Sequence, residues 1–265
     1  MENNEEKIDD LSNLSTNSVY RTIKILESLS VNSGFTLEEL APVVGLAKPT
    51  LFRFLSILQK LDYVEKNRDN RYKLTSKLFS VACRSIDDVE LSRIAKPFME
   101  DLSFITGETS ILCILEDNSA LHVRTVFSRY EQRFYERIGK HSPLYCTSAG
   151  QILLSGLNED DFLKYISKEV LIPYTSNTIK NPVQLRDVIK KIKENGYAES
   201  VSEYEQNIHG LACPIFDHDG KIIASLSINW PLFRETEGKR DFCLENLIKA
   251  SSDISTNMGY VLSLK

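Results

Sequence analysis

Four side chains at the start of one predicted helix have the chemistry to contact DNA. Lys48, Thr50, Phe52 and Arg53 follow one another closely on the polar face of that helix. The guanidinium of Arg53 presents two parallel donors that match guanine, and Thr50 and Phe52 can contact neighbouring base edges. A helix N-terminus also favours a phosphate, which Lys48 would help to hold. We therefore expect this end of the helix to enter a DNA major groove.

A basic hairpin follows this helix and predicts further contacts with the phosphate backbone. Arg68 lies in the turn-rich segment 67–70, and Arg71 comes directly after it. From Lys48 to Leu74 there are seven basic and three acidic residues, a local charge of +4 in a chain of net charge −5. Such a basic island in an acidic protein is expected where DNA binds. The residues predicted to contact DNA are Lys48, Pro49, Thr50, Phe52, Arg53, Arg68 and Arg71.

Small and hydroxyl-bearing side chains at two later places favour a ligand pocket. The segment SPLYCTSAG (142–150) leads from a loop into a predicted helix, where free N–H groups and the hydroxyls of Thr147 and Ser148 suit a carboxylate. Ser225, Ser227 and Asn229 alternate on one face of a predicted strand. The alternative interpretations are a helix cap at Thr147 and Ser148 and a solvent-exposed strand face at the serines. The functional interpretation is a sensor pocket that could hold a carboxylate, and at this point both interpretations stay open.

The cysteines indicate neither a metal site nor a catalytic nucleophile. Cys146 lies near His141 and Cys213 near His209, but neither pair has a visible third partner. There is no phosphate-binding glycine loop, metal-binding motif or GxSxG segment. We therefore predict no enzymatic activity, no metal and no cofactor. A redox sensor that uses Cys146 or Cys213 remains an alternative. The cysteines are scattered through the chain at Cys83, Cys113, Cys146, Cys213 and Cys243.

A winged helix-turn-helix would position the DNA-contacting side chains. Gly45 ends the first helix and permits the sharp turn, and Pro49 suits the first turn of the second. Residues 63–66 and 71–74 flank a loop of turn-forming residues and predict the hairpin, or wing. Asp62, before the wing, is a residue type that tolerates the left-handed conformation. Apolar residues recur at helical spacing at Leu37, Leu40, Ala41, Val44, Leu51, Leu55 and Leu58.

The remainder of the chain predicts an α+β domain around an antiparallel sheet. Strands are expected at 109–115, 120–127, 132–137, 211–216 and 221–229, and helices at 158–167, 182–195 and 238–262. The predicted organisation is a disordered tail at 1–15, a winged helix-turn-helix domain at 16–75, a stiff helical linker at 76–90 and an effector-binding and oligomerisation domain at 91–265.

Composition agrees with a two-domain globular protein. The chain has 265 residues, of which 42% are hydrophobic and 26% charged. No run approaches the roughly 18 apolar residues of a membrane span. The polar, acidic start MENNEEKIDD has no features of a signal or transit peptide, so we expect a cytoplasmic protein with no membrane partner.

The chain resembles the IclR-type bacterial transcriptional regulators in both predicted domains. The matching motifs are LEELAPVVGLAKPTLFRFLSILQKLDYV and RYKLTSKLF in the first, and ERIGKHSPLYCTSAGQILLSG and CPIFDHDGKIIASLSINWP in the second. Within the family, RFYERIGKHSPLY, IFDHDG and the closing residues 257–260 look closest to the KdgR-type repressors of pectin and keto-sugar-acid breakdown. The resemblance implies a GAF-like effector-binding domain. It also implies a homodimer or a dimer of dimers on a palindromic operator, and a small carboxylate effector.

The resemblance also places the effector contacts and exposes several departures. Ser200 stands where an acidic residue is usual, Gly210 where a cysteine is frequent, and Asn229 where a second serine is usual. We interpret the loss of a carboxylate beside the pocket as favouring an anionic effector, or an effector with different hydroxyl groups. The expected function is repression of a catabolic operon, relieved by an acid such as a keto-deoxy sugar acid. The alternative is an activator that responds to an aromatic or short-chain acid. The implied effector residues are Ser148, Ala149, Ser200, Gly210, Ser227 and Asn229.

Overall fold

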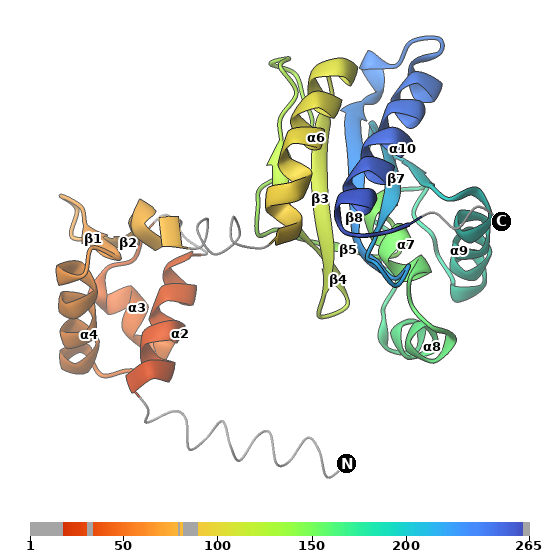
Figure 1. Ribbon diagram of the computed structural model, residues 1–265. Coiled ribbons are helices and arrows are strands. Elements are labelled where there is room, and N and C mark those ends of the chain that lie inside the picture. Colours follow the sequence, from red (N-terminus) through yellow and green to blue (C-terminus); the bar gives the residue numbers. More distant parts are fainter. Residues whose placement is uncertain (1–17, 31–33, 79, 82–89, 262–265) are drawn as a thin grey trace. The chain divides into compact units, whose positions relative to one another are not determined.

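The computed structural model describes residues 18–30, 34–78, 80–81 and 90–261, which fall into two compact units divided between Ser85 and Ile86. Each unit is described by itself (Figure 1). The predicted tail at 1–15, Cys83 and most of the predicted linker at 76–90 lie outside the described residues. No single described helix is long and apolar enough to cross a membrane. The helix pair Leu37–Val44 and Lys48–Lys60 reaches that length and composition only together, with a bend of 104° between them.

The first unit is a three-helix core with a two-stranded wing. Its elements are α2 (Ser18–Ser30), α3 (Leu37–Val44), α4 (Lys48–Lys60), β1 (Val64–Lys66) and β2 (Tyr72–Leu74). Gly45 adopts φ 70° after α3, as the turn requires, and Asp62 adopts φ 58° before the wing. Phe35 forms an isolated bridge with Tyr72, so the wing is joined to the segment before α3.

The predicted apolar stripes form the core of this unit. Leu51, Leu55 and Leu58 of α4 are buried against Leu40 and Val44 of α3 and against α2. Thr36 begins α3 with a capping box. Its hydroxyl accepts from the Glu39 N–H at 3.2 Å, while the Glu39 carboxylate accepts from the Thr36 N–H at 2.9 Å. Ala47 is the N-cap residue of α4 and makes no side-chain hydrogen bond to the helix. The second helix is therefore fixed by packing and by Pro49 in its first turn.

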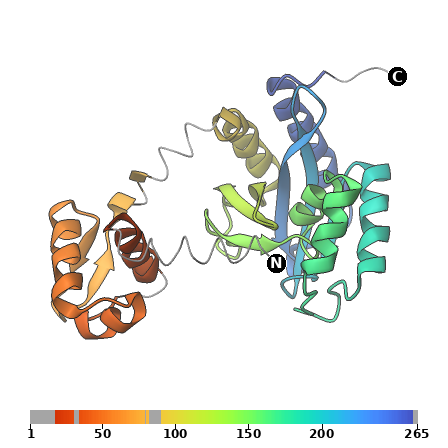
Figure 2. The ribbon, with the colours of Figure 1, turned by 90° about the horizontal axis from the view of Figure 1, so that it is seen from below.

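The second unit is a six-stranded antiparallel sheet with helices on both faces (Figure 2). The strand order is β5-β4-β3-β8-β7-β6. The bounds are β3 Thr109–Glu116, β4 Ser119–Val126, β5 His141–Pro143, β6 Ala198–Val201, β7 Ile208–Phe216 and β8 Ile222–Pro231. Two hairpins, β3–β4 and β7–β8, are joined at the centre by β3 pairing with β8. This arrangement agrees with the predicted α+β class.

The two faces of the sheet pack against different helices. One face, with Leu226, Ile228 and Trp230, packs against α6 (Glu90–Thr106) and α10 (Lys239–Asn257). The other face, with Ile111 and Ala212, packs against α7 (Ser148–Ser155), α8 (Glu159–Lys168) and α9 (Pro182–Asn195). Alternation along β8 turns Ser225, Ser227 and Asn229 toward the α7 side, away from the face of Leu226 and Ile228. Ser225 and Ser227 are buried there, so the solvent-exposed interpretation of this strand face is wrong.

One predicted strand, at residues 132–137, is absent. The edge of β4 is occupied instead by β5, whose His141 and Ser142 pair with Leu121 and Ala120. The segment before β5 is held by side-chain contacts, because Thr109 donates to the Phe134 carbonyl at 2.9 Å and Tyr135 stacks on Phe127. Because β5 already occupies the edge of β4, residues 132–137 have no strand to pair with and do not form one. The helix predicted at 182–195 is confirmed, and the Asn181 side chain caps it by accepting from the Gln184 N–H.

Candidate functional site

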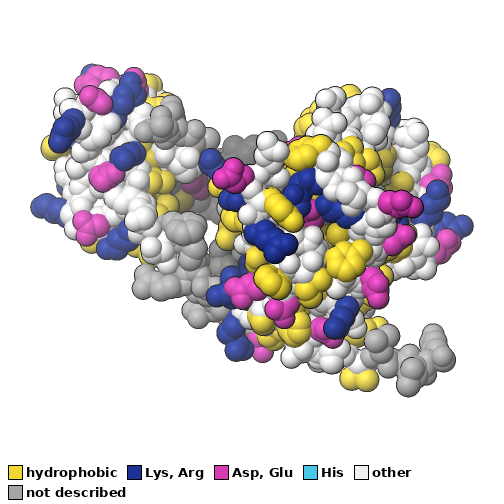
Figure 3. Space-filling view, turned by 90° about the horizontal axis from the view of Figure 1, so that it is seen from above, with side chains coloured by type: hydrophobic (Ala, Val, Ile, Leu, Met, Phe, Trp, Pro, Cys, Tyr) yellow, Lys and Arg dark blue, Asp and Glu magenta, His cyan; other side chains and the backbone are white. Residues whose placement is uncertain are grey.

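The start of α4 presents the residues that were predicted to contact DNA. Lys48, Pro49, Phe52 and Arg53 are exposed, and Thr50 is half-buried. Phe52 is 51% exposed, although a phenyl ring on the surface gains nothing from water. Lys48 forms only a long surface contact of 3.6 Å with Glu38. These side chains are therefore available to a partner. Lys and Arg side chains are prominent at several places on the first unit (Figure 3).

The two arginines of the wing that were predicted to bind phosphate have different surroundings. Arg68 is exposed in the turn, which is organised by the Asn67 side-chain oxygen accepting from the N–H groups of Asp69 and Arg71 at 3.0 and 2.9 Å. Arg71 instead directs its guanidinium along the surface to Glu39 of α3. It pairs with both carboxylate oxygens of Glu39 at 3.0 and 3.1 Å and donates to the Gly34 carbonyl at 3.0 Å.

These contacts give Arg71 a structural role. The Thr36 N–H and then the Arg71 pair hold the pKa of Glu39 below its usual value, so the carboxylate stays charged beside the guanidinium. A bidentate pair of this kind fixes the wing to the start of α3. Sequence spacing could not show this partner, because Glu39 lies 32 residues from Arg71. Arg71 thus holds the wing in position, and the predicted phosphate contacts of Arg68 and Arg71 both stay predictions.

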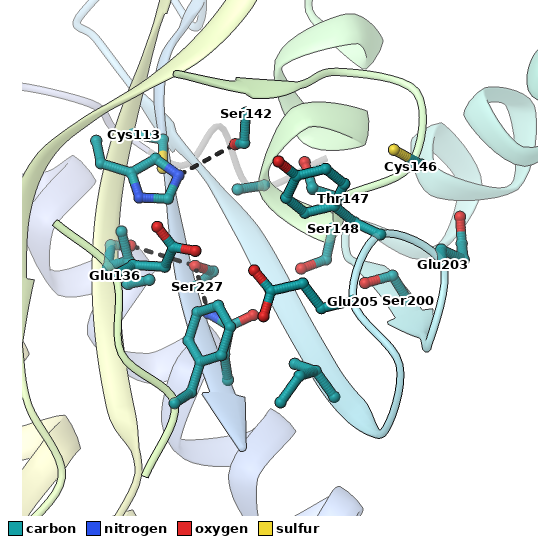
Figure 4. Close-up of a pocket in the computed structure, with 17 residues that line it drawn as sticks. Cys113, Glu136, Ser142, Cys146, Thr147, Ser148, Ser200, Glu203, Glu205 and Ser227 are labelled. Atoms are coloured by element: carbon teal, nitrogen blue, oxygen red, sulfur yellow. Dashed lines mark hydrogen bonds between the residues drawn. The ribbon is translucent and has the colours of Figure 1, made fainter. Parts of the chain in front are cut away.

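A pocket lies in the second unit between the sheet and α7 (Figure 4). It has about 500 Å³ of empty space, including the part that opens to solvent. Five of the six residues implied as effector contacts line it, namely Ser148, Ala149, Ser200, Ser227 and Asn229.

The sixth, Gly210, forms the floor between these side chains. A Cβ atom at this position would lie 2.6 Å from the Asn229 side-chain oxygen, 2.9 Å from the Ser148 hydroxyl and 3.2 Å from the Ser200 hydroxyl. Only the absence of a side chain therefore lets these three polar groups converge on one place. β7 pairs Gly210 with Ser200 of β6 and with Asn229 of β8, which explains why the residues meet.

The N-terminus of α7 supplies hydrogen-bond donors to the pocket. Thr147 caps the helix, with its hydroxyl accepting from the Gly150 N–H at 3.1 Å, so the alternative interpretation of Thr147 as a helix cap is confirmed. The Gln151 N–H donates to the Thr147 carbonyl at 2.9 Å. The N–H groups of Ser148 and Ala149 precede these and have no acceptor within the helix. A helix start of this kind stabilises a carboxylate that lies close to it along the helix axis.

Three carboxylates also line the pocket, and sequence reasoning missed them. Glu136 comes from the segment before β5, while Glu203 and Glu205 come from the loop between β6 and β7. Burial raises the pKa of Glu203 to about 7, and a hydrogen bond from Gln151 partly opposes that change. Burial also raises the pKa of Glu136, against the opposing effect of its contact with Lys140.

These acids correct the expectation of a pocket that has lost its carboxylate. Ser200 on β6 has no carboxylate, but the loop five residues later provides Glu205, which approaches Lys140 at 3.5 Å. Figure 4 shows the carboxylates of Glu136 and Glu205 turned toward one another, with Ser227 near them. The acids belong to loops without periodic structure, so the only available signal was the acidic segment Glu203-Tyr204-Glu205 between two strands.

His122 of β4 is a second lining residue that the sequence did not reveal. Its Nε2 lies 3.1 Å from the Ser142 hydroxyl, while its Nδ1 is buried without a hydrogen-bond partner among the described residues. Burial, followed by the positive charges of Lys140 and His141, lowers the pKa of His122 to about 4. The ring is therefore neutral at pH 7.

The cysteines are unsuited to redox sensing. Cys146 and Cys213 are buried, and burial raises the pKa of each thiol to about 12. The thiolate, which is the reactive form, is therefore scarce at neutral pH. His209 does not activate Cys213, because its two ring nitrogens contact Glu199 at 2.8 Å and Glu235 at 3.1 Å. The redox alternative thus has no support.

Comparisons with known proteins assign both units to one family of regulators. The IclR helix-turn-helix domain matches residues 18–68, and the C-terminal domain of bacterial transcriptional regulator IclR matches residues 83–256. The chain is 34% identical to the HTH-type transcriptional regulator KdgR of Escherichia coli (strain K12), covering 93% of this chain and 94% of that protein. It is 32% identical to KdgR of Dickeya chrysanthemi, covering 93% and 81%.

Solved structures show the same architecture. The crystal structure of Thermotoga maritima IclR aligns with a TM-score of 0.79 at 26% identity and covers 92% of this chain and 99% of that one. The C-terminal domain of E. coli KdgR aligns with a TM-score of 0.59 at 32% identity, over 64% of this chain and 99% of that one. The relatives carry the names of transcriptional regulators, and the prediction that the chain is not an enzyme is confirmed.

Proposed function

Because this chain belongs to the IclR family of bacterial transcriptional regulators, we propose that it represses a catabolic operon in the cytoplasm and that a small carboxylate releases it from DNA. Regulators of this family bind DNA through the helix-turn-helix domain and small effectors through the C-terminal domain. The proposed effector is a keto-deoxy sugar acid. The likeness to the two KdgR proteins supports this narrower assignment.

One observation carries the proposal, namely the convergence on Gly210 in the second unit. Ser148, Ser200 and Asn229 meet where a Cβ atom would exclude them, beside a helix N-terminus. The N–H groups at this helix start would hold the carboxylate of the effector. The carboxylates of Glu136 and Glu205 accept hydrogen bonds and would suit hydroxyl groups on the same molecule. A polyhydroxylated acid uses both sets of groups.

The DNA contacts follow from the exposed start of α4. Arg53 would bind guanine, and Thr50 and Phe52 would contact the adjacent base edges. Lys48 and Arg68 would hold phosphates, and Pro49 would set the entry of the helix. The lack of a side-chain cap at Ala47 leaves the first N–H groups of α4 free for a phosphate oxygen.

A homodimer, or a dimer of dimers, would present two α4 helices to a palindromic operator. Effector binding would then change the distance between the two winged helix-turn-helix domains of the dimer. This requires that the effector bind the two arrangements with different affinities. In this proposal, effector binding lowers the affinity of the chain for DNA, which is the behaviour of a repressor.

Two buried serines on the same strand provide a matched test. Ser227 and Ser225 are 2% and 0% exposed, but only Ser227 lines the pocket. Ser227→Val should abolish the response of DNA binding to 2-oxo-4,5,6-trihydroxyhexanoate, a keto-deoxy sugar acid, while DNA affinity without the acid stays unchanged. Ser225→Val should leave both quantities intact. An equal loss of response in the two variants, measured by fluorescence anisotropy, would assign Ser227 a role in folding instead.

A further inference from the structure

His122 is a buried pocket residue with one ring nitrogen unused. Its side chain is 6% exposed, and Nδ1 has no hydrogen-bond partner among the described residues. Buried polar atoms nearly always have a partner, because an unmade hydrogen bond in the interior is costly. The residue lines the same pocket as Ser148 and Asn229. A ligand in the pocket is therefore the available partner for this nitrogen.

The other ring nitrogen determines what kind of partner Nδ1 needs. Nε2 lies 3.1 Å from the Ser142 hydroxyl, and that hydroxyl also points to the Ala120 carbonyl at 3.5 Å. A carbonyl oxygen can only accept, so a hydroxyl that donates to it accepts from Nε2–H. The ring then carries its proton on Nε2, and Nδ1 keeps a lone pair. The lowered pKa of His122 agrees with a neutral ring of this kind.

We propose that the Nδ1 lone pair of His122 accepts a hydrogen bond from a hydroxyl group of the effector, so that this residue selects hydroxylated carboxylates over carboxylates without hydroxyls. The inference rests on the proposed function and adds the residue that distinguishes among acids. A carboxylate oxygen cannot satisfy Nδ1, because neither atom has a proton to donate. A site built to bind a hydroxyl disfavours the analogue that lacks it, since the site's polar group is then left unpaired.

Two acids with the same carbon skeleton test the inference. 2-Oxo-4,5,6-trihydroxyhexanoate and 2-oxohexanoate share the keto acid and the six-carbon chain and differ only in three hydroxyls. Isothermal titration calorimetry on the full chain would give the ratio of their dissociation constants. The wild-type chain should prefer the trihydroxy acid by at least about tenfold, since one buried hydrogen bond contributes close to that factor.

Three variants separate the role of Nδ1 from general effects on the pocket. His122→Gln places an amide donor near Ser142 but no acceptor at the position of Nδ1. It should reduce the preference by about tenfold, mainly through weaker binding of the trihydroxy acid. Ser142→Ala removes the group that fixes the proton on Nε2, and should reduce the preference by about threefold. Ile208→Val alters another lining residue without a polar atom, and should leave the preference unchanged.

Each outcome decides a different claim. If both acids bind and His122→Gln keeps the wild-type preference, the role of His122 is overturned while the proposed carboxylate effector stands. If neither acid binds the wild-type chain, the proposed effector class fails and this inference fails with it. A thermal melt checks that His122→Gln is folded. If it is not, Ser142→Ala decides, and an unchanged preference in that variant overturns the inference.

Discussion

Adding a single methyl group at Gly210 should separate ligand response from DNA binding. The Cβ atom of Gly210→Ala would lie 2.6 Å from the Asn229 side-chain oxygen and 2.9 Å from the Ser148 hydroxyl. Both distances are shorter than a carbon–oxygen contact of about 3.3 Å permits, so the two side chains must move apart. Asn229 would then lose its hydrogen bond to the Ser227 hydroxyl, which is 3.1 Å long in the wild-type chain.

The size of the effect follows from this overpacking. Inserting a methyl group into a packed site costs about 1–3 kcal/mol, which corresponds to a fall in Tm of about 2–4 °C for each kcal/mol in a domain of this size. Affinity for 2-oxo-4,5,6-trihydroxyhexanoate should fall more than stability, by about tenfold to a hundredfold, because the methyl group fills the floor of the pocket and displaces two polar groups. DNA affinity without ligand should stay at the wild-type value.

Gly196→Ala is the matched control for stability. Gly196 ends α9 with φ 78°, and a Cβ atom there would meet nothing within 4 Å. The substitution costs about 1–2 kcal/mol of backbone strain, so it lowers Tm to a similar degree without touching the pocket. Calorimetry with the acid, a thermal melt and DNA anisotropy would be measured for both variants. Wild-type affinity for the acid in Gly210→Ala would refute the role of this glycine, as would an equal loss of affinity in Gly196→Ala.

Three further outcomes follow from the described contacts. Burial raises the pKa of Glu203 from 4.5 to about 7. Between pH 4.5 and pH 7 the folded chain therefore binds more protons than the unfolded chain. The free energy of unfolding should fall by up to about 3 kcal/mol as the pH rises through this range. Glu203→Gln should flatten that dependence in pH-resolved denaturation, and an unchanged slope would contradict the assignment. Arg71→Ala should lower the Tm of the first unit, because it removes the pair with Glu39. Arg68→Ala should leave Tm unchanged and reduce the salt dependence of DNA binding by about one charge. An Arg71→Ala variant with the wild-type Tm would contradict the role of Arg71 in positioning the wing. Replacing Cys146 and Cys213 together with serine should keep the ligand response under oxidising and reducing conditions alike, and a redox-dependent loss in the wild-type chain alone would restore the redox alternative.

Local signals were sufficient for most of the fold. The turn at Gly45, the cap at Asn181 and the αL conformation at Asp62 were all predictable, because each depends on one residue and its immediate neighbours. The apolar stripe of α4 was predictable for the same reason, since helical periodicity determines which face is buried.

Features that depend on distant residues were not predictable. The pairing of Arg71 with Glu39 and the absence of a strand at 132–137 are both decided by a partner elsewhere in the chain. The contact between His122 Nε2 and the Ser142 hydroxyl joins two strands that are 20 residues apart in the sequence. The effector residues were obtained from resemblance to a family. Their convergence around Gly210 emerges only when β6, β7 and β8 are paired.

The response of DNA binding to a hydroxylated acid tests the central claim most directly. Double-stranded DNA would be selected from a random library by the wild-type chain, and its affinity measured by fluorescence anisotropy with and without 2-oxo-4,5,6-trihydroxyhexanoate. We expect a palindromic consensus and a fall in DNA affinity of at least about tenfold, close to the coupling of 1.4 kcal/mol for each factor of ten. Unchanged affinity at a concentration of the acid that saturates the pocket would contradict the proposal that this chain is a carboxylate-released repressor.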